Sequence, residues 1–364
     1  MMGDRFVQQQ GTYLLSHSVG LPLRDAEQRA AEAFWHPWQA GNADIWQHWL
    51  QEINVFRGEL AQLFNGDMDY FCPQSSLSSA VSKIVISLSL PTQKTTILLS
   101  EEDFPSIAFA LQKTDLPLKF IPAAEDTTDL TVWARHMSPD IGLVLVTHVQ
   151  SNNGRQLPVT EITQLSRDKG ILSLIDVAQS AGILPIDLCQ WSADFVVGSC
   201  VKWIGGGPGA AVMWVAPSVV ERCQPKTVGW FSHENPFEFD IHHFAYAPDA
   251  LKFWGGTPSV YPFVVAANSL KFINQIGIKA IREHNLRLSD KIIQATNGGE
   301  LVSPRSAAQR SGTVILQFSG RQASVLSALH EQQIHVDSRA KGIRLSPHLC
   351  NSAEQINALI KHIF

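Results

Sequence analysis

The sequence has few cysteines, few charges and no long uninterrupted apolar run. Its five cysteines are scattered, odd in number and never spaced as CxxC, so neither a disulfide framework nor a zinc site is indicated. Charged residues make up 17% of the chain, the net charge is -5, and no long basic run occurs. These numbers argue against nucleic acid or an anionic membrane surface as a partner. The apolar stretches are short or contain glycine and proline, so no membrane-spanning helix is expected.

The first residues, MMGDRFVQQQGTYLL, lack the apolar core of a secretion signal. Together with the unpaired thiols, this predicts a cytoplasmic protein. The chain has 364 residues, of which 45% are hydrophobic. That is enough for a large core and predicts either two domains or one large domain with a smaller one.

Short apolar runs alternate with amphipathic stretches, which is typical of an α/β fold with a mainly parallel sheet. The runs predicted to be buried strands are 95–100, 141–149, 170–177, 194–199 and 209–215. Apolar residues at helical spacing predict a helix over 77–88 and another at the end of the chain, where Ser352 and Gln355 suit a capping box. A long helical region over 262–293 joins two halves, and the remainder predicts a small α+β domain.

The segment IDVAQSAGILPIDLCQWSADFVVGSCVKWIGGGPG carries an acid near one end and a lysine near the other. Asp176 ends a predicted strand, where doubly wound sheets bind ligands, although capping of a following helix explains it equally well. Lys202 follows strand 194–199 among apolar neighbours that would lower its pKa, although a lone lysine at a strand end is more often a surface residue. An amine that forms a Schiff base and a carboxylate for a pyridinium nitrogen are the pair that pyridoxal phosphate (PLP) requires.

Two further segments suit the phosphate and the ring of that cofactor. Ser75 and Ser76 stand at the start of an amphipathic helix, whose free N–H groups favour an anion, although a plain N-cap explains them equally well. Phe104 follows strand 95–100 and can stack on a ring, although phenylalanine is usually a core residue.

Several motifs extend this pattern over most of the chain. They are YLLSHSVGLP (13–22), DFPS (103–106), DVAQSAG (176–182), GSCVKWIGGGPG (198–209), GWFSH (229–233), GGTPS (255–259) and IRLSPHLCNSAEQI (343–356). In this order they resemble the fold-type-I PLP enzymes of the class-V aminotransferase group, and kynureninases in particular. The resemblance implies the aspartate aminotransferase-like fold. By this resemblance, residues 1–45 form an N-terminal segment that packs on the small domain and the active site. Residues 46–254 form a large PLP-binding domain, and residues 255–364 form a linker helix with the small C-terminal domain.

The resemblance also implies roles for individual residues. Lys202 would form the Schiff base and move the substrate's α-proton, while Asp176 would hold the pyridinium. The remaining cofactor contacts would be Ser75, Ser76, Phe104, Ser106, Gln179, Ser199, Trp230 and Thr257. Arg344 would grip the substrate carboxylate through two parallel hydrogen bonds, and His17 and Ser18 would contact the substrate.

Trp230 and Thr257 match residues that act across a subunit interface in kynureninases. The resemblance therefore implies a homodimer with shared active sites. From the residues alone, Trp230 is explained equally well as a core residue, Thr257 as a turn cap and Arg344 as a surface arginine on a strand.

Two positions depart from the kynureninase pattern. Val201 stands where kynureninases usually carry a tyrosine, which questions hydrolytic cleavage and favours an aminotransferase. Gln179 replaces a histidine, and glutamine can bond the ring oxygen but cannot titrate. The sequence predicts a kynureninase-like hydrolase acting on a small amino acid, with His233 as the candidate titrating group for water. The alternatives are a class-V aminotransferase or lyase and a catalytically silent PLP-binding protein. No metal is expected at this site.

Overall fold

The computed structural model describes residues 2–41, 43–296 and 300–363. Its larger part contains a six-stranded sheet in the order β3-β2-β4-β5-β6-β7, and all neighbours are parallel except the antiparallel pair β6–β7. The strands are β2 (Thr96–Ser100), β3 (Leu118–Ile121), β4 (Ile141–Thr147), β5 (Leu172–Asp176), β6 (Phe195–Ser199) and β7 (Ala211–Val215). The predicted α/β fold with a mainly parallel sheet is therefore confirmed.

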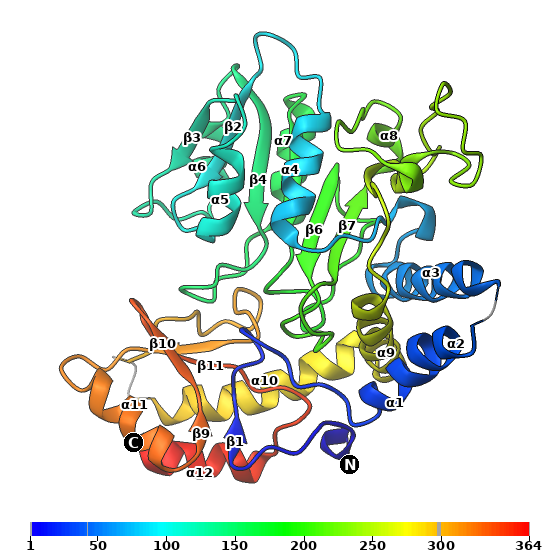
Figure 1. Cartoon of the computed structure of the whole chain (residues 1–364). Helices are drawn as coiled ribbons and strands as arrows, with labels where there is room; N and C mark the ends of the chain where they lie inside the picture. The colour runs from blue at the N-terminus through cyan, green and yellow to red at the C-terminus, as the bar shows by residue number, and fades with distance from the viewer. Residues whose placement is uncertain (1, 42, 297–299, 364) are drawn as a thin grey trace.

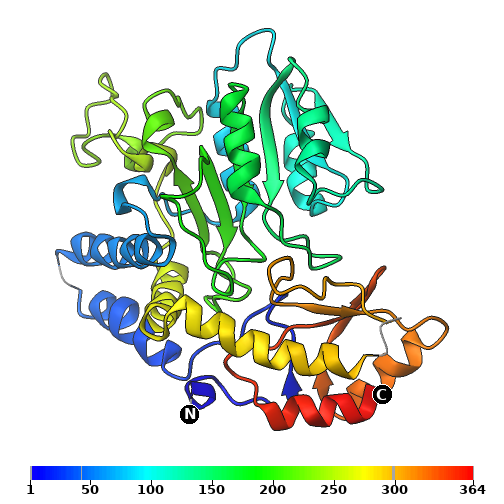
Figure 2. The same cartoon turned by 180° about the vertical axis from the view of Figure 1, so that it is seen from behind.

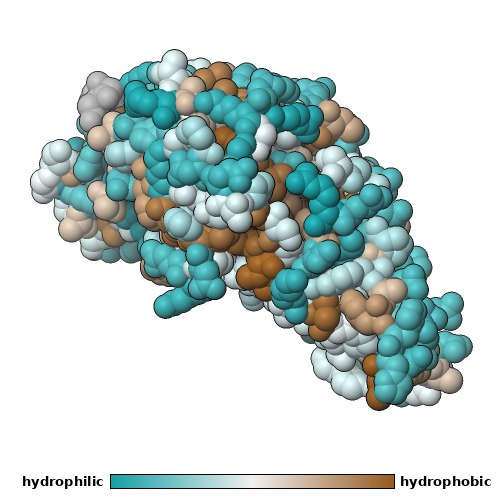
Figure 3. All heavy atoms as spheres, turned by 90° about the horizontal axis from the view of Figure 1, so that it is seen from above, coloured by the Kyte–Doolittle hydropathy of each residue, from teal (hydrophilic) through white to brown (hydrophobic). Residues whose placement is uncertain are grey.

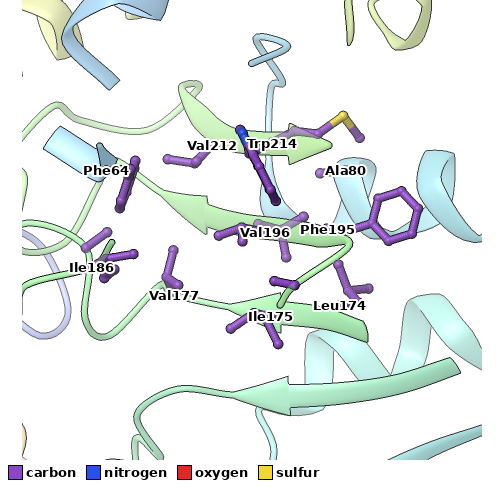
Figure 4. Close-up of a cluster of buried hydrophobic side chains, with 14 of the residues drawn as sticks. Phe64, Ala80, Leu174, Ile175, Val177, Ile186, Phe195, Val196, Val212 and Trp214 are labelled. Atoms are coloured by element: carbon purple, nitrogen blue, oxygen red, sulfur yellow. The ribbon is translucent and has the colours of Figure 1, made fainter. Parts of the chain in front are cut away.

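Apolar runs explain the central strands, because their residues are buried on both faces of the sheet. Figure 4 shows how Leu174 and Ile175 of β5, Phe195 and Val196 of β6 and Trp214 of β7 form one cluster of buried side chains. The sequence analysis missed β3, an edge strand whose residues are mostly half-buried or exposed. Because its side chains are only partly buried, β3 lacks the continuous apolar run that predicted the other strands.

Helices cover both faces of this sheet. Figures 1 and 2 show α4 and α5 on one face and α7 on the other. The helices of the larger part are α3 (Ile45–Phe64), α4 (Leu77–Ser87), α5 (Pro105–Leu111), α6 (Leu130–His136), α7 (Val159–Asp168) and α8 (Pro217–Val220), with single turns η3 (Met68–Tyr70), η4 (Trp230–Ser232) and η5 (Ala250–Phe253). None of the helices in the described part of the chain has the length and apolar character needed to cross a bilayer.

Two helices, α9 (Tyr261–Ile276) and α10 (Ile278–Ala295), connect the larger part to the smaller one, where the sequence indicated one long helical region. They are separated by Gly277, whose φ of 84° is readily adopted only by glycine and ends α9. The chain thereby changes direction between the two parts.

The smaller part has its own core and a three-stranded antiparallel sheet in the order β10-β11-β8. Its elements are β8 (Val314–Leu316), α11 (Gln322–Glu331), β9 (Ile334–His335), β10 (Asp337–Arg339), β11 (Gly342–Leu345) and α12 (Ala353–Ile363). The capping box that precedes α12 is confirmed. Ser352 donates its N–H to Gln355 Oε1 at 3.0 Å, and Gln355 donates its N–H to Ser352 Oγ at 3.3 Å.

The N-terminal segment contacts both parts. Its elements are η1 (Met2–Arg5), β1 (Thr12–Tyr13), α1 (Ala26–Ala30), η2 (Ala31–Trp35) and α2 (His36–Gln39). α1 and η2 pack against α9. In the smaller part, β1 pairs in parallel with β9, and Leu15 forms a bridge with Ser346 just after β11. These pairings carry residues 16–20 to the edge of the large sheet, where Gly20 donates its N–H to Val201 O at 2.8 Å.

Candidate active site

A cavity of about 160 Å³ lies at the carboxyl ends of the central strands. Thr147 ends β4, Asp176 ends β5 and Ser199 ends β6, and all three line the cavity. This is the edge at which open parallel sheets bind ligands. The predicted site residues that line the cavity are Phe104, Ser106, Asp176, Gln179, Ser199 and Lys202. Residues distant in sequence are thus brought together as the motifs indicated.

Asp176 is a buried acid with a fixed orientation. Its Oδ1 accepts a hydrogen bond from the Ala178 N–H at 2.7 Å. Burial raises the pKa of Asp176 above its ordinary value, and the positive charge of Lys202 counteracts this. A further cation in the cavity, such as a pyridinium, would stabilise the carboxylate in its charged form.

Lys202 presents an unpaired amine in the turn after β6. Within the described part of the chain its Nζ makes no hydrogen bond or ion pair, and it lies 5.6 Å from the centroid of the Phe104 ring. Burial lowers the pKa of Lys202, Asp176 raises it, and Arg344 lowers it. A lowered pKa increases the fraction of neutral amine, which is the form that attacks an aldehyde.

The N-terminal segment holds the lysine turn in place through Gly20. A Cβ atom at Gly20 would lie 2.1 Å from Lys202 O and 2.8 Å from Gly205 Cα. Only glycine allows the two backbones to approach this closely.

Phe104 is exposed to the cavity rather than buried in the core. It precedes Pro105 at the start of α5, and 48% of the residue is exposed. Its ring is therefore available to a ligand. The alternative that Phe104 is a core residue is wrong.

Hydroxyl groups at the start of α4 and α5 form one side of the cavity. Ser78 Oγ lies 2.7 Å from Ser106 Oγ, and both residues line the cavity. Ser76 caps α4 by accepting the Ser79 N–H at 3.2 Å, and Ser75 lies in a separate cavity. The helix N-terminus was thus predicted correctly, but the serine at the cavity is Ser78. The sequence alone could not show which of these serines faces the cavity, because the direction of each side chain depends on the residue at which the helix begins.

Gln179 is held between the N-terminal segment and the lysine turn. Its Nε2 donates to the His17 carbonyl at 3.0 Å, and its Oε1 accepts from Trp203 Nε1 at 3.3 Å. Ser199 Oγ accepts from the Val201 N–H at 3.5 Å. Both side chains are thereby oriented at the cavity wall.

Arg344 does not line the cavity but bonds to Ser151, which does, and it is paired with an acid that the sequence analysis did not single out. Arg344 Nε donates to Asp337 Oδ1 at 2.8 Å and Nη2 donates to Oδ2, while Nη1 donates to Ser151 O at 3.4 Å. Asp337 lies directly opposite Arg344 in the β10–β11 pair. Because Ser151 lines the cavity, the Nη1 edge of the guanidinium is the one nearest to it.

His17 completes this network from the N-terminal segment. His17 Nε2 lies 3.0 Å from Asp337 Oδ1, and Nδ1 lies 2.7 Å from Ser346 Oγ. Burial would raise the pKa of Asp337, but its bonds with His17 and Arg344 hold that pKa well below the ordinary range. Burial also lowers the pKa of His17, more than Asp337 raises it. His17 thus connects the N-terminal segment to the arginine–carboxylate pair.

Besides Ser75, Ser76, His17 and Arg344, four more residues named by the sequence analysis do not line this cavity within one chain. Ser18 lies in a turn, where its N–H bonds to Leu15 O. Trp230 packs in an aromatic cluster with Trp46 and other rings. Thr257 lines a second cavity with Ser75 and Lys83, and His233 lies near Glu238 and His243. Their predicted roles remain predictions.

The residues that line the first cavity fit PLP. Asp176 is a buried carboxylate suited to a ring nitrogen, Lys202 is an amine that bonds to none of the described residues, and Phe104 is an exposed ring beside it. Ser78 and Ser106 add hydroxyl donors near the start of α4, where the helix dipole favours a phosphate.

Comparison with known proteins agrees with this geometry. The sequence model described as "Aminotransferase class-V" matches residues 41–359. An uncharacterized aminotransferase from Bacillus subtilis is 28% identical over 321 residues, which cover 87% of this chain and 85% of that protein. Kynureninase from Deinococcus radiodurans is 28% identical over 350 residues, which cover 91% and 83%. Among solved structures, a C-DES mutant with glycine covalently linked to its PLP cofactor superposes with a TM-score of 0.88 at 22% identity, over 97% of this chain and 96% of the other.

Proposed function

Since the chain belongs to the aminotransferase class-V family, we propose that it acts on an amino acid by kynureninase-type hydrolytic cleavage of the side chain. It is an enzyme, and PLP is its cofactor. One observation carries the PLP chemistry, which both candidate reactions share: the Lys202 amine, which bonds to no described residue, shares a cavity with the buried carboxylate of Asp176. The similarity to kynureninase over 91% of this chain supports hydrolytic cleavage as the first candidate.

The chain's own residues supply distinct parts of this chemistry. PLP, when bound, withdraws electrons from the substrate's α-carbon. Asp176 would keep the ring nitrogen protonated, because a buried carboxylate stabilises a neighbouring cation. Lys202 would accept and return the α-proton, for which its lowered pKa suits it. Arg344 would orient the substrate through its carboxylate, since guanidinium groups bind carboxylates in a fixed geometry.

Aminotransferase activity is the second candidate, and the cavity lining favours it. Asp176 and Lys202 are the acid and base groups among the described lining residues, and Val201, beside the lysine, has no hydroxyl. His233 does not line the cavity of its own chain. Transamination requires proton movement by Lys202 but no activation of water, so these residues suffice for it.

A substrate panel distinguishes the two reactions. The purified protein should have a near-visible absorbance band that is lost in Lys202→Ala. Incubation with kynurenine should give anthranilate and alanine in equal amounts if cleavage is hydrolytic. Formation of a keto acid from alanine or glutamate, without anthranilate, would replace hydrolysis with transamination. A wild-type protein that gains no such band after incubation with PLP would contradict the assignment of Lys202.

We also propose that the enzyme is a homodimer in which Trp230 and Thr257 complete the site of the partner subunit. Both lie outside the Lys202 cavity of their own chain, and the space beside Thr257 is a polar cavity of about 160 Å³. Figure 3 shows hydrophobic residues exposed among hydrophilic ones near the centre of one face, and exposed apolar surface of this kind is common where proteins associate.

Mixed dimers test this arrangement. Lys202→Ala and Thr257→Ala subunits are each expected to form poorly active homodimers. Mixing them should restore activity, because one of the two sites then receives both intact residues. A fully active monomer, or no recovery after verified subunit exchange, would contradict shared sites.

A further inference from the structure

The loop that follows η4 brings two histidines and a glutamate together outside the Lys202 cavity. His233, Glu238 and His243 are evenly spaced along the chain, and one ligand atom from each lies within 4.8 Å of the others. His243 Nδ1 is 3.1 Å from Glu238 Oε1, and His233 Nε2 is 3.8 Å from Glu238 Oε2. We propose that these three side chains form a binding site for a divalent cation of the zinc type.

The separations between the donor atoms suit such an ion. Zinc binds histidine nitrogen and carboxylate oxygen at about 2.0–2.2 Å in tetrahedral geometry, which places neighbouring ligand atoms about 3.3–3.5 Å apart. The observed separations of 3.1 and 3.8 Å lie on either side of that range, although they join the two histidines to different oxygens of Glu238, and one ligand atom from each residue lies within 4.8 Å of the others. Small side-chain rotations would therefore allow the cation to contact all three residues. Because Glu238 and His243 are the more exposed members, a water molecule can occupy the fourth position.

The backbone of Asn235 holds the ring of His233. The Asn235 N–H donates to His233 Nδ1 at 2.9 Å, and the Asn235 carbonyl oxygen lies 3.0 Å from the same atom. Nε2 faces Glu238. Binding of a cation at Nε2 requires the ring proton on Nδ1, where the Asn235 carbonyl can accept it in place of the bond from the Asn235 N–H. The ring is also buried against Phe244, at a centroid distance of 5.5 Å, which holds its direction.

A cation here would connect the base of the loop to its tip. At the base, Glu234 donates its N–H to Ala245 O at 3.0 Å. Toward the tip, Phe239 and Ile241 are 74% and 92% exposed, and the Phe239 ring stacks on Trp230 at 6.3 Å. In Figure 1 the chain beyond α8 extends outward from the large sheet. Binding of the cation would thus stiffen the surface around Trp230.

Calorimetric titration of the tag-free holoenzyme with ZnCl2, after treatment with EDTA, tests the site. One Zn²⁺ per chain should bind, and His243→Ala and Glu238→Gln should each weaken binding at least tenfold. Both substituted side chains are exposed, so the variants should fold normally, as circular dichroism can verify. His242→Ala is the matched control, because it removes the exposed neighbouring histidine, which is not part of the cluster.

Cobalt provides an independent readout. Co²⁺ in place of Zn²⁺ should give visible d–d absorption bands that are absent from His243→Ala and present in His242→Ala. The proposal is overturned if the wild-type protein shows no saturable Zn²⁺ binding. It is also overturned if His242→Ala loses as much affinity as His243→Ala, since the ion would then bind to surface histidines without selecting the cluster.

Discussion

Removing the carboxylate of Asp337 should destabilise the protein by about 2–3 kcal/mol. The side chain is bonded to Arg344 and His17, both of which are buried. Deleting one partner of a buried ion pair costs about 3–5 kcal/mol, because the other charge is left uncompensated. The side chain of Asp337 is 29% exposed, so solvent screening reduces the expected cost.

Urea denaturation of Asp337→Ala, Arg344→Met and the double variant measures this interaction. The double variant should be more stable than the sum of the single effects predicts, by about 1–3 kcal/mol, because each single change leaves its partner unpaired. The exposed pair Arg155–Asp126 is the matched control, and Asp126→Ala should cost less than about 1 kcal/mol. Additive effects at Asp337 and Arg344, within about 0.5 kcal/mol, would refute the reasoning.

The same pair has a defined pH dependence. The folded state lowers the pKa of Asp337 below its ordinary value of 3.8. The contribution of Asp337 is therefore present above pH 3.8 and is lost as the pH falls through the folded-state pKa. The stability difference between the wild-type protein and Asp337→Asn should accordingly be constant at neutral pH and shrink below pH 3.8. A difference that instead grows in acid would contradict the assigned direction of the shift.

Three further predictions concern Asp103, Gly20 and Ser352. Burial raises the pKa of Asp103 from 3.8 to about 7, so wild-type stability should fall as the pH rises from 3.8 to 7. Asp103→Asn should remove this loss of stability. The loss is roughly 4 kcal/mol for the full pKa shift and about 1–2 kcal/mol once the partial exposure of Asp103 is considered. If the stabilities of the wild-type protein and the variant, measured by urea denaturation, changed in parallel with pH, the raised pKa would be contradicted. Gly20→Ala should cost about 1–3 kcal/mol and alter the absorbance of the bound cofactor, because its Cβ would lie 2.1 Å from Lys202 O; an unchanged spectrum and stability would disprove the close contact. Ser352→Ala should cost about 1 kcal/mol in thermal or urea unfolding, because its Oγ no longer accepts the backbone N–H of Gln355. The same cost should persist in a Gln355→Ala background, since alanine keeps that N–H, and an unchanged stability in both backgrounds would contradict the cap.

The fold was largely predictable because its central strands are continuous apolar runs. Such runs have no polar face, so they indicate strands buried within a parallel sheet. The edge strand β3 escaped because its side chains are partly exposed. The division of the long helical region at Gly277 was also missed, since one glycine is often tolerated within a helix.

The centre of the candidate site was predictable because Asp176 and Lys202 lie near the ends of predicted strands. Parallel strands bring their carboxyl ends to one edge, and this requires no knowledge of tertiary detail. Ser78 and Asp337 were harder. The direction of Ser78 depends on the residue at which α4 begins, and the partner of Arg344 depends on the register of the β10–β11 pair. Both are decided by tertiary packing and not by residue type.

His17 shows why the site depends on the assembled chain. Its carbonyl accepts from Gln179 in the large sheet's cavity, and its ring bonds to Asp337 and Ser346 in the smaller part. A displacement of the smaller part would therefore change the contacts of Gln179 and of Arg344 together, because the short segment around His17 connects them. Because Asp337 occupies the Nε edge of Arg344, the substrate carboxylate that we propose Arg344 binds would approach the remaining Nη1 edge, beside Ser151. In this proposal, Asp337, which does not line the cavity, sets the edge of Arg344 that remains open to the substrate.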